Sequence, residues 1–122
     1  MSKLTGNADD MVVHGQGVFT IIQPTMVLVS REMNVPLTVV RAANPKERNT
    51  SDPEWMRGAR VRFIANYLVN TALGIPQAAL ARAYGVSAAA ICQQLQKIED
   101  ERDDNAELDQ LLDRLTDDLV VA

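Results

Sequence analysis

The segment of residues 77–95, QAALARAYGVSAAAICQQL, restricts the possible folds more than any other part of the sequence. Gly85 divides it into two stretches whose apolar residues recur at helical spacing, and glycine tolerates the left-handed backbone that a tight turn requires. Ala81 is small enough for a close helix crossing. The pattern predicts two short helices joined by a tight turn, as in a helix-turn-helix, although an ordinary helical hairpin packed into a core would show the same pattern.

Apolar residues recur at helical spacing along most of the remaining chain, and no segment shows the alternation of a β-strand. Prolines, glycines and capping residues mark the ends of the predicted helices. We predict helices from Pro24 to before Asn34, from Pro36 to about Ala42, from Pro53 to about Ala72, from Pro76 to Gly85, from Ser87 to about Ile98, and across the leucine-rich segment 108–119. Residues 42–54 are predicted to form an exposed loop. The sequence therefore predicts an all-α fold of about six helices.

The domain organisation is predicted to be simple, because 122 residues suffice for one hydrophobic core and hardly for two. Residues 1–18 contain three glycines and no clean apolar period, so we expect a flexible N-terminal arm there. Residues 19–122 would form a single helical domain. No stretch approaches the roughly 20 apolar residues of a membrane span, and the acidic N-terminus lacks the apolar centre of a signal peptide. We therefore expect a cytoplasmic protein with no membrane contact.

Residue types that carry chemistry are scarce in this chain. The only cysteine is Cys92 and the only histidine is His14, which excludes a disulfide framework and a Cys/His metal site. We interpret Cys92 as a small buried apolar residue or an inert thiol, and His14 as a surface residue. No paired catalytic carboxylates and no phosphate-binding glycine loop are found, so we predict no enzymatic activity, no cofactor and no metal.

Charge is divided unevenly along a chain whose formal net charge is −4. Residues 99–122 carry ten acidic and two basic residues, whereas residues 1–98 carry ten basic and six acidic ones. Six of the basic residues lie between Arg41 and Arg62. A basic cluster beside a predicted helix-turn-helix favours binding to double-stranded DNA, although solvated helix faces show such clusters too. The acidic segment serves either solubility or contact with a protein partner.

Three runs carry a resemblance to a known family: VRFIANYL at 61–68, LARAYG at 80–85 and QKIE at 96–99. They resemble segments of the C-terminal DNA-binding domain, the fourth domain, of DnaA, the bacterial initiator of chromosome replication. That family shows Ala-Arg-Gln-Ile-Ala-Met-Tyr-Leu, Ile-Gly-(basic)-x-Phe-Gly and Arg-Lys-Ile-Glu at these places. The resemblance covers about residues 19–119 and implies a short stand-alone relative of a helix-turn-helix domain that binds double-stranded DNA.

The chain departs from this family at the start of the second helix of the turn motif. The family has Asp-His-Thr-Thr-Val-x-His-Ala there, which contacts the initiator's recognition box, whereas this chain has SAAAICQQ at 87–94. We therefore expect no preference for that box. The family's phosphate-contacting positions correspond to Arg62 and to a basic loop with Lys46 and Arg48. Phosphate contacts supply affinity and register rather than sequence information.

The altered helix retains side chains that can read DNA. Alanine contacts the thymine methyl group, glutamine can bond adenine through two hydrogen bonds, and serine can donate or accept, a set that favours A·T-rich DNA. An Ala- and Gln-rich surface is also typical of a helix without this role, because both residues are good helix formers. We interpret Trp55 and Tyr84 as core residues. The candidate DNA-contacting residues are Lys46, Arg48, Arg57, Arg60, Arg62, Ser87, Ala88, Ala89, Gln93, Gln96 and Lys97.

Two functions are compatible with these observations. The first is a nucleoid-associated DNA-binding regulator of bacterial replication initiation or transcription, with altered sequence readout. The second is an adaptor that does not bind DNA and instead contacts a replication protein or a protein that regulates the initiator.

Overall fold

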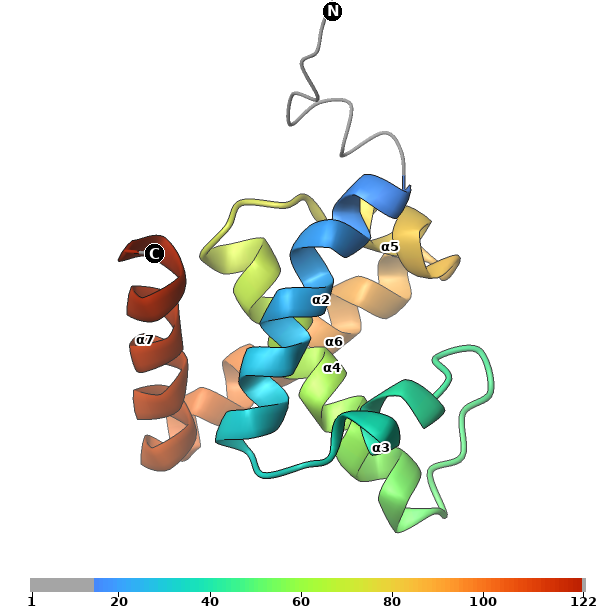
Figure 1. The fold of residues 1–122 in the computed structure, drawn as a ribbon, viewed down its shortest axis with the longest axis horizontal. Helices are drawn as coiled ribbons and strands as arrows, with labels where there is room; N and C mark the ends of the chain where they lie inside the picture. Colours follow the sequence, from blue (N-terminus) through green and yellow to red (C-terminus); the bar gives the residue numbers. More distant parts are fainter. Residues whose placement is uncertain (1–14, 122) are drawn as a thin grey trace, which may run out of the picture.

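The computed structural model of this protein describes residues 15–121, which form six α-helices and no strand (Figure 1). The helices are α2 (Gly15–Glu32), α3 (Leu37–Ala42), α4 (Pro53–Thr71), α5 (Gln77–Tyr84), α6 (Ala88–Asp104) and α7 (Ala106–Val121). The predicted all-α fold is confirmed. His14 lies outside the described residues, as does most of the predicted N-terminal arm.

The central element is α4, which packs against α2, α3, α6 and α7 (Figure 1). It begins where the sequence predicts: Pro53 occupies its first turn, and the Asp52 carboxylate accepts a hydrogen bond from the Glu54 backbone N–H at 3.0 Å. Buried aliphatic side chains such as Ile64 and Leu68 place this helix inside the core. The first turn differs, since Pro53, Glu54 and Met56 are exposed.

The first helix starts earlier than the sequence predicts. Residues 15–18 already belong to α2, and Val18 is completely buried, so this part of the predicted flexible arm is wrong. Pro24 lies inside the helix rather than at its start. Proline removes the hydrogen bond to the carbonyl of Thr20, but both residues face solvent, where water can satisfy that carbonyl. The apolar period that begins before Pro24 therefore outweighs the helix-breaking effect of the proline.

The turn between α5 and α6 forms as predicted. Gly85 adopts a left-handed backbone with φ of 67°, and its N–H bonds to the last carbonyls of α5. The Ser87 hydroxyl caps α6 by accepting a hydrogen bond from the Ala90 N–H at 3.0 Å. The two helices joined by this turn pack against each other.

Tyr84, at the end of α5, is packed into the domain, as the sequence predicts. Its ring meets that of Phe19 edge to face with centroids 5.4 Å apart, and its hydroxyl donates to Asn66 Oδ1 at 2.8 Å. Burial raises the pKa of Tyr84 to about 12, because the phenolate would lose its hydration, while Arg62 and the bond to Asn66 act in the opposite direction.

The raised pKa of Tyr84 predicts a loss of stability at high pH. In the unfolded chain the phenol ionises near its ordinary pKa of about 10, so the folded state loses relative free energy as pH rises from about 10 to about 12. Urea unfolding across this range measures the loss. The variant Tyr84→Phe has no phenol at this position and should show a smaller fall over the same range. An equal fall in both proteins would contradict the assignment to Tyr84.

The sequence predicts that α6 ends at about Ile98, before the charged stretch. In the structure the charged stretch belongs to the helix, which continues to Asp104. Asn105 then separates α6 from α7 and caps α7 by accepting a hydrogen bond from the Leu108 N–H at 3.1 Å. Cys92 is exposed on α6, so the first of its two interpretations, a small buried apolar residue, is wrong. A charged helix end is stable here because many of its side chains point to solvent.

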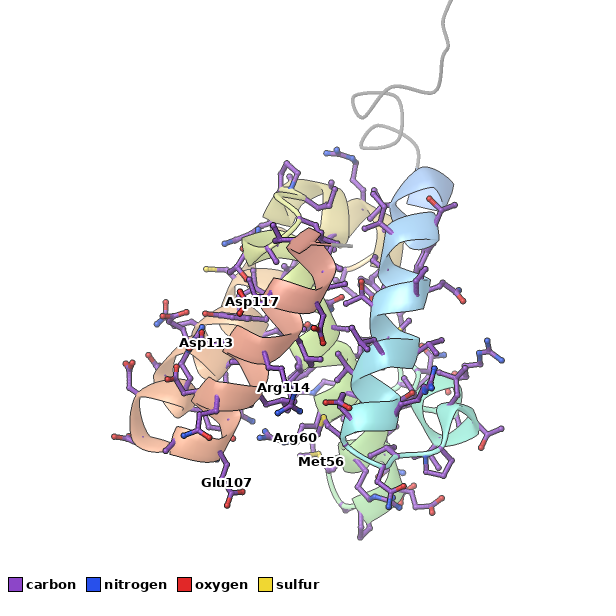
Figure 2. The ribbon with its side chains drawn as sticks, turned by 60° about the vertical axis from the view of Figure 1, so that its left-hand side comes forward. Met56, Arg60, Glu107, Asp113, Arg114 and Asp117 are labelled. Atoms are coloured by element: carbon purple, nitrogen blue, oxygen red, sulfur yellow. The ribbon has the colours of Figure 1, made fainter. Side chains whose placement is uncertain are left out.

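The amphipathic helix α7 is attached to the domain through polar contacts as well as leucines. Arg102 reaches across from α6 to Asp109 and Asp113, at 2.7 and 2.8 Å, and also donates to the Tyr67 hydroxyl. Arg114 points toward α2, where it pairs with Glu32, while the side chains of Asp113 and Asp117 lie on the far side of α7 (Figure 2). The outer face of α7 is consequently acidic.

Candidate nucleic-acid interface

The loop of residues 43–52, between α3 and α4, is held at its start by two side chains of α4. Trp55 Nε1 donates a hydrogen bond to the Asn44 carbonyl oxygen at 3.2 Å, and Arg62 Nη1 donates to the Ala43 carbonyl oxygen. These contacts fix the direction in which the loop leaves α3. The basic residues of the loop therefore have a defined place on the domain.

That place is next to the turn between α5 and α6. A Cβ placed on Gly85 would lie 2.9 Å from Lys46 Nζ, so the end of the Lys46 side chain lies against the turn. Ser87, which caps α6, follows Gly85 by two residues. The Lys46 ammonium group is therefore close to the start of α6.

The first turns of α6 present the predicted reading residues to solvent. Ser87, Ala88, Ala89 and Gln93 are all exposed. A helix whose N-terminal residues are exposed has the geometry by which helix-turn-helix proteins contact base edges in the major groove. These four side chains are consequently accessible to a ligand, as the predicted role requires.

Gln96 is exposed as well, but its amide already has a partner. Gln96 Nε2 donates to Asp100 Oδ1 at 2.8 Å, on the same helix. The neighbouring positions Glu99, Asp103 and Asp104 are also exposed carboxylates. The carboxylates of this half of α6 would repel phosphates, and Lys97 is the cation among them.

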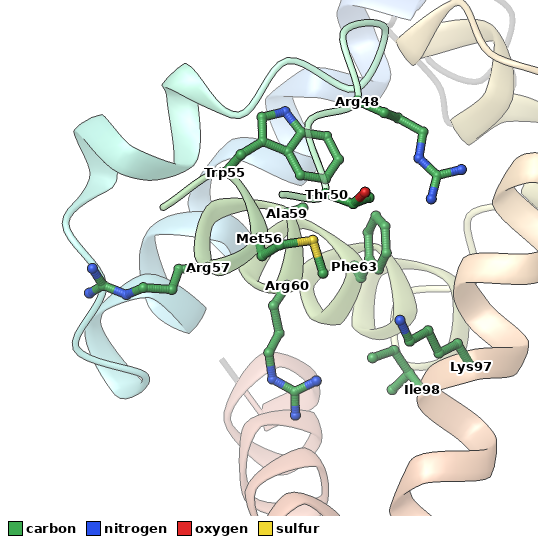
Figure 3. Close-up of a pocket in the computed structure, with 10 residues that line it drawn as sticks. All are labelled: Arg48, Thr50, Trp55, Met56, Arg57, Ala59, Arg60, Phe63, Lys97 and Ile98. Carbon is green, nitrogen blue, oxygen red and sulfur yellow. The ribbon is translucent and has the colours of Figure 1, made fainter. Parts of the chain in front are cut away.

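Two further basic residues, one in the loop and one on α6, lie at the same hollow. Arg48 in the loop and Lys97 on α6 are exposed and line the same hollow, on the same side of Phe63 (Figure 3). Arg57, at the start of α4, points away from them and lies 3.9 Å from the Glu54 carboxylate. The structure thus joins Arg48 to Lys97 and leaves Arg57 apart.

Arg60 is engaged in an ion pair within the domain. Its guanidinium forms two hydrogen bonds to the Glu101 carboxylate, one of them at 2.9 Å from Nη1 to Oε1. The hydrogen bond from Arg60 lowers the pKa of Glu101 below its ordinary value, burial opposes this, and the charges of Arg60 and Lys97 add to the lowering. The charge of Arg60 is therefore neutralised at short range by α6.

Arg62 is buried, with 4% of its surface exposed, and this is the largest departure from the sequence prediction. Its guanidinium lies 5.9 Å from the ring centroid of Trp55 and 5.8 Å from that of Phe63, and it bonds to the Ala43 carbonyl. Burial lowers its pKa, with a smaller opposing effect from Tyr84. In this structure the Arg62 guanidinium therefore does not face solvent, where the predicted phosphate contact would require it, and it packs inside the domain instead.

The exposed residues that the structure brings together are called the loop–α6 surface below. They are Lys46, Arg48, Ser87, Ala88, Ala89, Gln93 and Lys97. This surface combines three cations with a small, uncharged helix face. Cations of this kind bind phosphates, and the helix face is small enough to enter a groove.

Apolar side chains that were not predicted from the sequence as site residues lie beside this surface. Met56 is exposed and Phe63 half-buried, and both line the hollow next to Arg48. Their signal is present in the sequence, since Trp55, Ala59 and Phe63 recur every four residues on one face of α4. This pattern was not interpreted as part of a site, because Trp55 was expected to be a core residue.

Comparisons of this chain with protein families, with curated proteins and with solved structures give no match. The resemblance to the DnaA domain therefore stays a prediction from the sequence. Within residues 15–121 no helix is both long enough and apolar enough to span a membrane. The same residues contain no group of three His, Cys, Asp or Glu side chains placed to hold a metal ion.

Proposed function

We propose that this protein binds double-stranded DNA through the loop–α6 surface and acts as a bacterial regulator of replication initiation or transcription. The observation that carries the proposal is the approach of the Lys46 side chain to the turn at Gly85, because it places a cation of the basic loop near the exposed start of α6. Helix-turn-helix proteins dock in this way, with the second helix in the groove and flanking cations on the phosphates. The resemblance to the DnaA domain supports the same function.

The second candidate is an adaptor that contacts a replication protein or a protein regulating the initiator. The observation that favours it is the continuation of α6 through Asp104, which carries a run of carboxylates along the helix proposed to dock on DNA. Exposed carboxylates oppose phosphate binding and attract basic protein surfaces. The two candidates therefore differ in how they respond to salt and to DNA.

The first candidate predicts duplex binding that weakens as salt rises. Each phosphate contact releases counterions and contributes about −0.9 to the slope of log K against log salt concentration. Titration of a fluorescent duplex at several salt concentrations measures this slope. Arg48→Ala and Lys97→Ala should each make it shallower by about one and weaken binding to all sequences about equally.

Arg31→Ala is the matched control for these variants. Arg31 is exposed in the last turn of α2 and is not part of the loop–α6 surface. Its loss should leave the slope within experimental error of the wild type. The DNA-binding proposal fails if the protein does not bind duplex at low salt, or if its binding is indifferent to salt.

A further inference from the structure

A hollow of about 260 Å³ opens between the loop of residues 43–52, the first half of α4 and the middle of α6. Its interior is mainly apolar and is formed by Trp55, Met56, Phe63 and Ile98 (Figure 3). Met56 has 40% of its surface exposed, and among the described residues only Val120 is comparable as an exposed large apolar side chain. A concave apolar surface with an exposed methionine is typical of a binding site, because methionine adapts its shape to a ligand.

The mouth of the hollow is cationic on one side. Arg48 and Lys97 stand beside Phe63 there, whereas Arg57 and Arg60 extend away from it (Figure 3). Neither Arg48 nor Lys97 forms an ion pair with a carboxylate of the described residues. A ligand in the hollow would therefore meet two cations whose charges are not neutralised by a direct partner.

A third positive charge lies behind the aromatic residues of the hollow. The Arg62 guanidinium is buried within 6 Å of the ring centroids of Trp55 and Phe63, and no carboxylate of the described residues pairs with it. In a low-dielectric interior its field is less screened than that of an exposed charge. The hollow as a whole thus favours an apolar group that is accompanied by negative charge.

We propose that this hollow binds a short acidic segment of a partner protein, which inserts one large apolar side chain between Met56 and Phe63. Aspartate or glutamate residues beside that side chain would meet Arg48 and Lys97. A nucleobase fits the lining less well, because Thr50 is the only uncharged hydroxyl or amide side chain among the lining residues and a base carries several polar edge atoms. The chemistry of the lining therefore points to a peptide.

This docking site does not depend on the proposed DNA binding, but the two share Arg48 and Lys97. An acidic segment seated in the hollow would occupy the cations that otherwise face phosphates. Bound peptide and bound duplex should therefore exclude one another if both proposals hold. This competition would give an acidic partner control over DNA binding.

Selection from a random 12-residue peptide library displayed on phage tests the proposal with the wild-type protein. We expect enrichment of peptides that carry one large apolar residue flanked by aspartate or glutamate. Met56→Glu should lower the affinity for a selected peptide at least about tenfold, because it places a negative charge at the apolar entrance. Val120→Glu is the matched control, since Val120 is 63% exposed on α7, and it should change the affinity less than about twofold.

Trp55, the only tryptophan of the chain, reports whether the hollow itself is occupied. A selected peptide without tryptophan should change the fluorescence of Trp55 in the wild type and in Val120→Glu, and binding should weaken in Arg48→Ala and at high salt. The proposal is overturned if no acidic peptide is enriched, or if Met56→Glu binds as the wild type does. It is also overturned if single-stranded oligodeoxythymidine changes the fluorescence and selected peptides do not. Duplex binding is measured in a separate titration. The DNA-binding proposal and the peptide-binding proposal can therefore fail independently of each other.

Discussion

Gly58→Ala should lower the free energy of unfolding by about 2 kcal/mol, although alanine is the better helix former by about 1 kcal/mol. Gly58 lies in α4 where α3 crosses it. A Cβ at this position would lie 2.5 Å from the Val39 carbonyl oxygen and 2.8 Å from the Ala43 Cβ. The carbonyl belongs to the backbone of α3, so no side chain can rotate to make room. The two helices must instead move apart, which loses apolar contact along their crossing.

Urea unfolding measures this loss, and Gly74→Ala is the matched control. Gly74 has φ of 74° but nothing within 4 Å of a Cβ, so alanine there suffers backbone strain of about 1–2 kcal/mol without a clash. The two variants differ in a second measurement. Displacement of α3 moves the Asn44 carbonyl that accepts the Trp55 indole N–H, so the fluorescence of Trp55 should change in Gly58→Ala and not in Gly74→Ala. A Gly58→Ala protein as stable as the wild type would show that the crossing tolerates a methyl group.

Helix positions could be predicted from the sequence because local residues determine them. Pro53, Ser87 and Gly85 act within one turn of their own positions, and each forms the helix start, cap or turn that was predicted. The predicted start of α2 at Pro24 was wrong, because proline is a local signal for a helix start and tertiary packing overrides it here. Val18 and Ile22, both completely buried, extend the helix past it. Helix boundaries predicted from proline alone are therefore unreliable where buried apolar side chains lie on both sides of the proline.

Which basic side chains form ion pairs and which remain exposed could not be predicted, because the pairing depends on residues far away in the sequence. Arg60 finds Glu101 across forty-one residues, and the lysine of the loop approaches Gly85 across thirty-nine. Sequence spacing indicates that these cations cluster but not which of them a carboxylate neutralises. Three of the predicted cations therefore reach the loop–α6 surface, while the remaining three serve α4 and its contacts. The same long-range packing creates the hollow beside Met56, which no local pattern delimits.

Arg62→Ala should lower the free energy of unfolding by about 3 kcal/mol, the second large effect we expect. The substitution leaves a cavity between Trp55 and Phe63 and removes the hydrogen bond to the buried Ala43 carbonyl. Arg62→Met keeps most of the volume and removes a buried charge that has no carboxylate partner, so its loss should be nearer about 1 kcal/mol. Urea unfolding of both variants separates the packing of Arg62 from its charge.

The same pair of variants decides what Arg62 does for DNA binding. If its buried position is kept when the protein binds duplex, Arg62→Met should leave the salt slope of log K unchanged, because no phosphate contact is lost. If Arg62 instead turns outward to a phosphate, as the resemblance to the DnaA domain implies, the slope should become shallower by about 0.9. Arg48→Ala provides the opposite control, since Arg48 is exposed in the loop: stability should hold while the slope changes. A stable Arg62→Met protein with a reduced slope would therefore place Arg62 on the DNA and would contradict a purely structural role.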